Sequence, residues 1–282
     1  MKKGLVLEGG AMRGMFTCGV IDVMMENNIN FDGIIGVSAG AAFGCNYKSK
    51  QLGRGIRYNM RFCNDKRYCG LYSFLTTGNL YGAEYCYKIV PTQYDVFDYD
   101  TFYDNPMEFV AVCTDIETGK PYYKHFEKRE ENVFEWFRAS ASLPLVSHIV
   151  EIDGMKLLDG GIVDSIPLRY FEDIGYDKNI VVLTQPKEYR KTKNKLMPIF
   201  NLLYRKYPKF VKAIENRYNM YNETLDYIKK RENEKGIFVI RPECDLDIKK
   251  VEKNPENLKR VYEIGRATAQ KHLDEIIKYL EN

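Results

Sequence analysis

Histidine, tryptophan and concentrated charge are all scarce in this sequence. Its 282 residues include three histidines and one tryptophan, and 42 lysines and arginines against 39 aspartates and glutamates leave a net charge of +3. Proteins that track nucleic-acid phosphates usually carry a strongly basic domain or stripe. The small net charge therefore argues against a nucleic-acid partner.

Long hydrophobic runs are also missing. No stretch of about 18 apolar residues, the length that crosses a bilayer, occurs in the sequence. The start Met1-Lys2-Lys3-Gly4 resembles the basic end of a signal peptide, but only Leu5 to Leu7 follow before Glu8, so no apolar signal core is present. We therefore expect a cytoplasmic protein whose membrane contacts, at the inner membrane surface, are peripheral.

Metal and cofactor motifs are absent too. The seven cysteines form no C-x-x-C pair and have no histidine cluster nearby, so their spacing does not indicate a zinc site. Most of them lie among apolar or aromatic residues, which is typical of core thiols in a reducing compartment. The G-x-G-x-x-G and P-loop patterns do not occur. The sequence predicts no metal and no cofactor.

The composition is that of a globular protein. Hydrophobic residues make up 45% and charged residues 29% of the chain, unlike the composition of disordered proteins. A chain of this length can fill one α/β domain, and no linker or repeat divides it. We interpret residues 1–282 as a single domain.

Strand-like and helix-like segments alternate at the start of the chain. Apolar residues 5–7 are followed by a glycine-rich turn and a helical stretch over about residues 14–27, and apolar residues 34–37 precede small residues that can pack a helix close to a sheet. This β-α-β-α order predicts a parallel sheet. Further strands are expected at residues 108–114, 122–126, 180–184 and 237–240, a hairpin at 149–158, and helices at 133–141 and 258–280. The sequence thus predicts an α/β fold, a three-layer sandwich with a mostly parallel central sheet.

A nucleophile pattern occupies the turn after the second expected strand. Gly36-Val37-Ser38-Ala39-Gly40 matches G-x-S-x-G, in which a serine on a tight strand-to-helix turn presents its hydroxyl outward. Gly36 and Gly40 are needed because larger residues would keep the strand and helix backbones apart. Ser38 is therefore the candidate nucleophile, although two glycines could also serve a plain βα turn.

The base that a serine nucleophile needs has three candidates. His272 is late enough for the α/β-hydrolase order of serine, acid and histidine, but it lies inside the expected terminal helix, where a solvent-exposed side chain is the simpler interpretation. His148 follows the helix expected at 133–141 and could approach the site. Asp159 ends an apolar strand and precedes Gly160-Gly161, although an ordinary Asp-Gly turn has the same pattern.

A glycine-rich loop after the first strand can supply hydrogen-bond donors. In the run from Glu8 to Gly14, the amides of Gly9, Gly10 and Ala11 precede a helix and can stabilise the oxyanion of a tetrahedral intermediate. Arg13 adds positive charge for an anionic group. A nucleotide phosphate could bind to a similar loop, but the motifs of such sites are absent.

In their order along the chain, these motifs resemble the patatin-like phospholipase family. That family has a glycine-rich loop ending in Arg or Lys and Gly, then G-x-S-x-G, then D-G-G or D-G-A. The resemblance covers about residues 4–185 and includes the run from Arg138 to Pro144, which looks like the family's A-S-x-x-x-P segment. It implies a patatin-like fold, Ser38 as nucleophile, Asp159 as the base of a Ser-Asp dyad, and no histidine in the site.

Two departures from the family pattern concern the glycine-rich loop. Ala11 stands where the family usually has a third glycine, and Glu8 stands where Asp is commoner. Ala11 still donates an N–H, but a positive φ at this position would strain an alanine. In that case we expect the oxyanion hole to form only when substrate binds.

Basic and apolar residues alternate from residue 187 to residue 212, and we interpret about 187–235 as a cap segment. A surface helix with one core-facing side explains such a pattern, and so does an element that covers the site and touches a membrane. Loops after the carboxyl ends of parallel strands border the site in such sheets. We therefore expect residues 187–212 to form a mobile cover that contacts anionic lipid surfaces.

Together, these residues predict a serine acyl-hydrolase. Its expected substrate is a fatty-acyl ester of a phospholipid, lysophospholipid or acylglycerol, cleaved through an acyl-Ser38 intermediate, with Gly36, Gly40, Gly160 and Arg13 supporting the catalytic residues. A carboxylesterase or thioesterase acting on soluble esters, and a lipid-binding regulator without turnover, are the alternatives. Acyl-chain length, head group and oligomeric state are not specified by the sequence.

Overall fold

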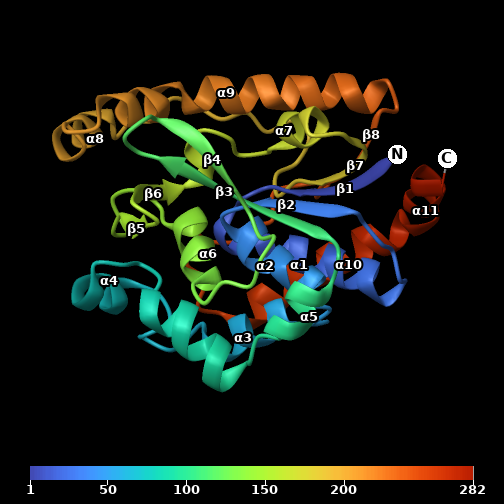
Figure 1. Cartoon of the computed structure of the whole chain (residues 1–282), viewed down its shortest axis with the longest axis horizontal. Helices are drawn as coiled ribbons and strands as arrows, with labels where there is room; N and C mark the ends of the chain where they lie inside the picture. Colours follow the sequence, from blue (N-terminus) through green and yellow to red (C-terminus); the bar gives the residue numbers. More distant parts are fainter. Residues whose placement is uncertain (282) are drawn as a thin grey trace.

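A single twisted sheet runs through the centre of the molecule, and helices cover both of its faces (Figure 1). The computed structural model describes residues 1–281. The strands are β1 (Lys2–Leu7), β2 (Gly33–Val37), β3 (Glu108–Asp115), β4 (Lys120–His125), β5 (Val150–Ile152), β6 (Met155–Asp159), β7 (Tyr176–Val182) and β8 (Ile237–Ile240). All eight strands belong to one sheet.

The sheet has a parallel part and an antiparallel part. Strands β3, β2, β1, β7 and β8 lie side by side in that order and run parallel to one another. Strands β4 and β6 pair antiparallel with β3, and β5 pairs antiparallel with β6. The mostly parallel α/β sheet that the sequence predicted is confirmed, with an antiparallel extension beyond β3.

The helices form one layer on each face of the sheet. They are α1 (Gly14–Glu26), α2 (Ala39–Lys48), α3 (Arg54–Phe62), α4 (Leu71–Thr77), α5 (Tyr99–Asp104), α6 (Val133–Ala141), α7 (Leu168–Asp173), α8 (Met197–Leu203), α9 (Pro208–Asn233), α10 (Pro255–Lys271) and α11 (Leu273–Glu281), with 3-10 turns η1 (Ala11–Arg13) and η3 (Gly160–Ile162) and a π-helix η2 (Tyr85–Tyr94). In Figure 1, α7 and α9 lie above the sheet, whereas α1, α2 and α10 lie below it. The three layers of the predicted sandwich are therefore present.

Successive side chains of the central strands point to opposite faces of the sheet, so a hydrophobic core forms on each face. In β1, Leu5 and Leu7 belong to the core shared with α1 and α10, whereas Val6 belongs to the core shared with α7 and α9. All three side chains are fully buried. A parallel strand that is covered on both faces needs apolar residues at every position, which is why these strands appear in the sequence as continuous apolar runs.

The predicted terminal helix over residues 258–280 is wrong as one element. It divides at His272 into α10 and α11, and His272 has φ −103° and ψ 9°. Beyond the break, Tyr279 donates a hydrogen bond to the carbonyl of Gly236 at 3.0 Å, and its ring packs on Phe238 of β8. The turn at His272 lets the apolar side of α11 face the edge of the sheet. If α10 continued straight along α1, its end would not reach that edge.

The basic and apolar segment after β7 consists of a loop, α8 and the start of α9. Helix α9 crosses the upper face of the sheet and buries Phe210, Ile214, Tyr221 and Leu225 (Figure 1). The core-facing surface helix that the pattern allowed is thus present, and it continues to Asn233, past the basic run that ends at residue 212 but within the interpreted segment of about 187–235. The loop and α8 leave several apolar side chains exposed. The mobility expected for this cover stays a prediction.

The seven cysteines of residues 1–281 are all free thiols. Burial raises the pKa of six of them, Cys18, Cys45, Cys63, Cys69, Cys86 and Cys113. Cys244 is exposed, in the loop between β8 and α10.

A helix that spans a bilayer must be long and predominantly apolar. Among residues 1–281, every helix is too short or too polar to span one.

Candidate active site

Ser38 occupies a strained turn between β2 and α2. Its backbone has φ 55° and ψ −120°, a conformation that non-glycine residues rarely adopt. A Cβ on Gly36 would lie 2.5 Å from the backbone of Gly40, and a Cβ on Gly40 would lie 2.4 Å from the carbonyl oxygen of Leu7. Both glycines of the G-x-S-x-G pattern are therefore required by close backbone contacts, and Ser38 is left 8% exposed at the carboxyl end of the sheet.

The pairing of β3 brings Ser38 and Asp159 together. Strand β4 occupies one edge of the second half of β3, so β2 and β6 share the other edge. Strand β2 pairs along that edge up to Val112, and β6 takes over where Asp159 pairs with Cys113. Because β2 and β6 run toward each other, Ser38 just after β2 and Asp159 at the end of β6 meet where the two strands end.

The carboxyl end of α6 holds both residues in place. Ser140 Oγ accepts a hydrogen bond from the Ser38 amide at 2.9 Å and donates to a carbonyl of β3 at 2.6 Å. The Ser142 carbonyl accepts from the Asp159 amide at 2.8 Å, and Thr114 Oγ1 donates to the Asp159 carbonyl at 2.7 Å. The segment that resembles A-S-x-x-x-P therefore positions nucleophile and carboxylate. Sequence analysis gave Ser140 no role, because its partners are distant in the chain.

Asp159 is a buried carboxylate with a raised pKa. The residue is 2% exposed, and burial raises its pKa, while the Ser38 hydroxyl, the Arg217 charge and the Gly161 amide oppose that rise. Oδ1 accepts from the Gly161 amide at 2.7 Å, whereas Oδ2 has no well-directed hydrogen-bond donor among residues 1–281. One carboxylate oxygen is thus left for the Ser38 hydroxyl, and the raised pKa makes Asp159 a stronger base than an exposed aspartate.

The glycine-rich loop lies over the nucleophile. A Cβ on Gly9 would lie 2.9 Å from the carbonyl oxygen of Val37 and 3.0 Å from Ser38 Cβ. The amides of Gly9, Gly10 and Ala11 donate to no acceptor within residues 1–281, which leaves them for an oxyanion. Ala11 has φ 48°, so the strain considered for an alanine at this position is present, at a cost of roughly 1 kcal/mol.

Two further predicted residues support this arrangement. A Cβ on Gly160 would lie 2.2 Å from the Val112 carbonyl oxygen, so the turn after Asp159 fits against β3 only with glycine. Arg13 lines a cavity next to Ser38.

Glu8, which replaces the commoner Asp, ties the loop to the opposite layer. Its Oε2 accepts from the Thr184 amide at 2.6 Å and from Thr184 Oγ1 at 3.1 Å, and its Oε1 accepts from the Tyr221 hydroxyl at 2.6 Å. Glu8 is 2% exposed. The longer side chain reaches α9, and all of its hydrogen bonds go to neutral groups.

The histidine candidates lie elsewhere. His148 is exposed, and its Nε2 contacts the Thr77 carbonyl at 3.0 Å. His272 ends α10 and contacts Glu275 at 3.0 Å, and His125 contacts the hydroxyl of Tyr170. No histidine of residues 1–281 lines either cavity at Ser38. Nor do three or more histidine, cysteine, aspartate or glutamate side chains of this range gather as a metal-binding group.

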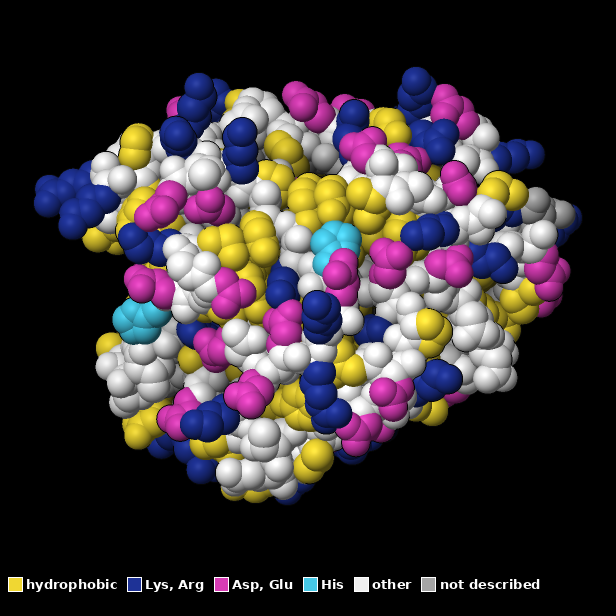
Figure 2. All heavy atoms as spheres, in the orientation of Figure 1, with side chains coloured by type: hydrophobic (Ala, Val, Ile, Leu, Met, Phe, Trp, Pro, Cys, Tyr) yellow, Lys and Arg dark blue, Asp and Glu magenta, His cyan; other side chains and the backbone are white. Residues whose placement is uncertain are grey.

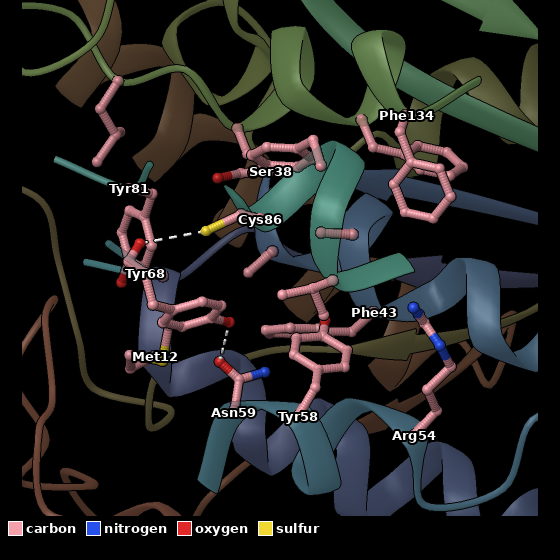
Figure 3. Close-up of a pocket in the computed structure, with 18 residues that line it drawn as sticks. Met12, Ser38, Phe43, Arg54, Tyr58, Asn59, Tyr68, Tyr81, Cys86 and Phe134 are labelled. Carbon is pink, nitrogen blue, oxygen red and sulfur yellow. Dashed lines mark hydrogen bonds between the residues drawn. The ribbon is translucent and has the colours of Figure 1, made fainter. Parts of the chain in front are cut away.

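An apolar cavity opens on one side of Ser38 (Figure 3). Its walls include Phe43, Tyr58, Tyr68, Tyr87, Phe134 and Phe137, from α2, α3, η2, α6 and the segment between α3 and α4. Arg54 lies across the cavity from Ser38 in Figure 3, where it is 2% exposed and pairs with Asp95 at 3.4 Å. Arg57 shares Asp95 with Arg54, and the apolar and aromatic side chains that form most of the wall suit a hydrocarbon group.

A polar cavity opens on another side of Ser38. Its walls are the glycine-rich loop, Asp159, and side chains from the segments after β7 and β8 and from α9: Tyr189, Lys191, Arg217, Tyr221 and Lys250. Ala11, Ser38 and Leu143 line both cavities. Ser38 therefore lies at the boundary between an apolar and a cationic compartment. The cationic residues of α9 and the β8–α10 loop were not predicted from the sequence.

Comparisons with known proteins agree on part of this description. A family model described as patatin-like phospholipase matches residues 5–172, and one described as a domain of unknown function (DUF6363) matches residues 207–281. The chain is 27% identical over 305 residues to the uncharacterized protein YjjU of Escherichia coli, covering 98% of this chain and 78% of that protein. It is 24% identical over 294 residues to lysophospholipase nte1 of Aspergillus oryzae, covering 97% of this chain but 18% of that protein.

One further relative and one solved structure are similar to this chain. An uncharacterized NTE family protein of Mycobacterium tuberculosis is 28% identical over 178 residues, covering 63% of this chain and 48% of that protein. Among solved structures, VipD from Legionella pneumophila matches with 13% identity and a TM-score of 0.48, over 97% of this chain and 67% of that one. Like the lysophospholipase, the NTE family protein is less than two thirds covered by this chain.

Proposed function

This chain belongs to the patatin-like phospholipase family, and we propose that it is a serine acyl-hydrolase that cleaves a fatty-acyl ester of a lipid. One observation carries the proposal: Ser38, beside a buried carboxylate, lies where an apolar cavity meets a polar one. An amphipathic ester whose acyl chain enters the first cavity and whose alcohol portion enters the second would place its carbonyl at the nucleophile. The lysophospholipase among the relatives is named for a substrate of this kind.

The proposed reaction begins with attack on the ester. Ser38 Oγ bonds to the carbonyl carbon while its proton passes to Asp159, and the amides of Gly9, Gly10 and Ala11 hold the oxyanion. The tetrahedral intermediate then breaks the bond to the alcohol oxygen, which takes the proton from Asp159. Water attacks the acyl-Ser38 ester with Asp159 again accepting a proton, and the fatty acid leaves as Ser38 recovers its own.

An aspartate can act as the base here because its carboxylate is buried. Burial raises the pKa of Asp159. The difference between this pKa and that of the serine hydroxyl becomes smaller, so proton transfer from Ser38 is less unfavourable. The Ser140 and Ser142 contacts fix both partners before substrate binds. Ala11 has the positive φ at which the oxyanion hole is expected to form only when substrate binds, and that expectation stays a prediction.

The test uses a fluorophosphonate probe and a lipid panel. The probe should label the parent protein and not Ser38→Ala, and the parent should release fatty acid from lysophospholipid or acylglycerol in vesicles or micelles. Absence of labelling favours a lipid-binding regulator, and turnover restricted to short soluble esters favours a carboxylesterase or thioesterase. Either result contradicts the proposal.

Two short helices with exposed apolar side chains lie beside the loop that carries Leu143 to both cavities. The exposed side chains are Leu71, Tyr72 and Leu75 on α4, and Ile199, Leu202 and Leu203 on α8, with Leu75 74% and Leu202 67% exposed. Both helices border the loop over residues 143–148. The Leu145 amide donates to the Tyr204 hydroxyl just after α8, and the Leu80 amide just after α4 donates to the Val146 carbonyl.

Basic side chains surround the exposed face of α8. Lys193, Lys195, Arg205 and Lys206 are exposed, and none of them forms an ion pair within residues 1–281. Figure 2 shows dark blue Lys and Arg side chains gathered with hydrophobic ones at the end of the molecule where Figure 1 places α8 and the start of α9. Exposed apolar groups ringed by lysine and arginine are typical of surfaces that bind anionic bilayers. We propose that α4 and α8 dock on such a surface and feed lipid to the cavities.

Vesicle co-sedimentation tests this docking face. Changing Lys193, Lys195, Arg205 and Lys206 to Glu should abolish binding to anionic vesicles at low salt, since each basic residue contributes about 1 kcal/mol near such a bilayer. Lys229→Glu with Lys230→Glu, at the other end of α9, is the matched control. Binding that persists in the first variant, or equal binding of the parent to neutral vesicles, would remove the docking role.

A further inference from the structure

Four cationic side chains from four segments line the polar cavity. Arg13 follows the glycine-rich loop, Lys191 lies in the loop after β7, Arg217 lies on α9, and Lys250 lies in the loop after β8. Their charges act on one another: Arg217, Arg13 and Lys250 all help to lower the pKa of Lys191 to about 8, after burial as the main cause. Like charges are thus held together beside Ser38.

None of the four cations forms an ion pair within residues 1–281. Nε of Arg13 is buried and has no hydrogen-bond partner in this range. Arg217 Nε donates to the Gly161 carbonyl, which leaves its two terminal nitrogens without an acceptor among these residues. The Lys191 ammonium lies 4.3 Å from the centre of the Tyr221 ring, which attracts a cation but does not neutralise it.

The carboxylates of the cavity do not balance these charges. Glu8 and Asp159 are its acidic residues, so four cations against two carboxylates leave a surplus of two positive charges. Both oxygens of Glu8 bind Thr184 and Tyr221, and Asp159 is engaged by the Gly161 amide and adjoins Ser38. Partly buried cations without partners cost free energy, which a bound anion recovers.

We propose that the polar cavity binds the phosphate of a phosphomonoester lipid, a monoacylglycerol phosphate, whose acyl ester lies at Ser38. The inference rests on the proposed hydrolase function and names its substrate class. A phosphate monoester carries close to two negative charges near neutral pH, which matches the surplus. A zwitterionic phosphodiester head group would add a cation to a cavity that already has four, and a neutral acylglycerol would leave all four unpaired.

The placement of the cations fits such a molecule. Lys191 and Arg217 line the same cavity as the glycine-rich loop and Ser38, so a phosphate a few bonds from the ester stays within their reach. Arginine and lysine form charge-assisted hydrogen bonds with phosphate oxygens. Lys250 is exposed at the cavity and can meet the phosphate as it enters.

The experiment compares 1-oleoylglycerol phosphate with 1-oleoylglycerol, presented in the same neutral detergent micelles. The parent should prefer the phosphate-bearing lipid by about tenfold or more in kcat/KM, the size expected when one charged hydrogen bond discriminates. Lys191→Met should reduce the ratio of the two kcat/KM values by about the same factor. Lys249→Met, next to Lys250 but outside the cavity, should leave the ratio unchanged.

Calorimetry separates this inference from the hydrolase proposal. Ser38→Ala should bind glycerol 3-phosphate, and the added change Lys191→Met should remove the binding. Such binding supports the phosphate site even where no lipid is hydrolysed, whereas its absence overturns the site even where Ser38-dependent hydrolysis is strong. A parent that binds inorganic phosphate equally well but shows no preference for the phosphate-bearing lipid also overturns the proposal, in favour of a free-phosphate site.

Discussion

The first part of the chain, residues 5–172, and the remainder, residues 173–281, contribute to the site in different ways. The first part supplies the proposed catalytic groups, which are Ser38, Asp159 and the amides of the glycine-rich loop. They are held by backbone geometry: a φ of 55° at Ser38, a φ of 48° at Ala11, and hydrogen bonds to main-chain groups. The second part supplies Lys191, Arg217 and Lys250, which act through side-chain charge.

This contrast predicts two kinds of sensitivity. Positions fixed by main-chain geometry tolerate few side chains, because a wrong atom collides with backbone that cannot move. Positions that act through charge at several ångströms tolerate substitution, and the activity changes gradually with the charge that remains. Loss of a catalytic group that the first part holds in place should therefore lower turnover most, and changes to the charges of the second part should alter turnover without abolishing it.

The largest loss of activity should come from Asp159→Asn, in the first part of the chain. The amide keeps the shape and can still accept from Gly161, but it removes the base, so we expect kcat/KM for a nitrophenyl ester to fall by about 10³-fold or more. His148→Ala is the control and should keep full activity, because its side chain lies outside both cavities. Activity of Asp159→Asn within about tenfold of the parent, 1.4 kcal/mol of barrier, would take Asp159 out of the base role.

A smaller loss is expected from Ser140→Ala, also in the first part. The change leaves the Ser38 amide and a β3 carbonyl buried without partners, at about 1–3 kcal/mol each, so kcat should fall roughly tenfold to a hundredfold with KM little changed. In Ser142→Ala the backbone carbonyl still holds Asp159 and only a bond to Arg138 is lost. Equal effects of the two changes on kcat would show that Ser140 does not position the nucleophile.

In the second part, Arg217→Gln should shift a pH profile and leave turnover possible. The Arg217 charge lowers the pKa of Asp159, so its removal raises that pKa further. Asp159 must be ionised to act as base, and activity is lost as the pH falls through its pKa. The acid limb of kcat/KM for a neutral nitrophenyl ester should thus move to higher pH, and less so in Arg217→Lys. An unmoved limb, or one displaced to lower pH, would contradict this coupling.

The smallest effect is expected from Ala11→Gly. This change tests whether the positive φ of Ala11 strains the backbone of the first part. Glycine adopts φ 48° without the Cβ clash, so stability should rise by about 1 kcal/mol or stay level. The acylation rate, followed by stopped-flow, should be unchanged or faster. A clear fall in that rate at an unchanged melting temperature would mean that Ala11 is not strained in the working enzyme.

The same division explains what the sequence could predict. Strands buried on both faces leave apolar runs such as Ile34–Val37, and tight turns leave glycine patterns around Ser38 and Asp159. Local rules therefore identified the central strands, the nucleophile turn and the carboxylate turn. The pairing of β2 and β6 along one edge of β3 was not predictable, because register depends on contacts between distant segments.

The missed features all depend on long-range packing. Ser140 acts on Ser38 through a single hydroxyl. Arg217 and Lys250 reach the cavity from a helix and a loop that carry no motif. The break at His272 follows from how α11 packs on the sheet edge, and the helical periodicity on its two sides continues without a signal.

The arrangement of the thiols has a practical consequence for labelling chemistry. A cysteine reacts with maleimides as its thiolate, so the six thiols whose pKa is raised by burial should react slowly at neutral pH. Cys244 is exposed, on the same loop that carries Lys250 to the cavity. A maleimide fluorophore should therefore label the natural chain mainly at Cys244. Its fluorescence should change if the loop moves when an anion enters the polar cavity.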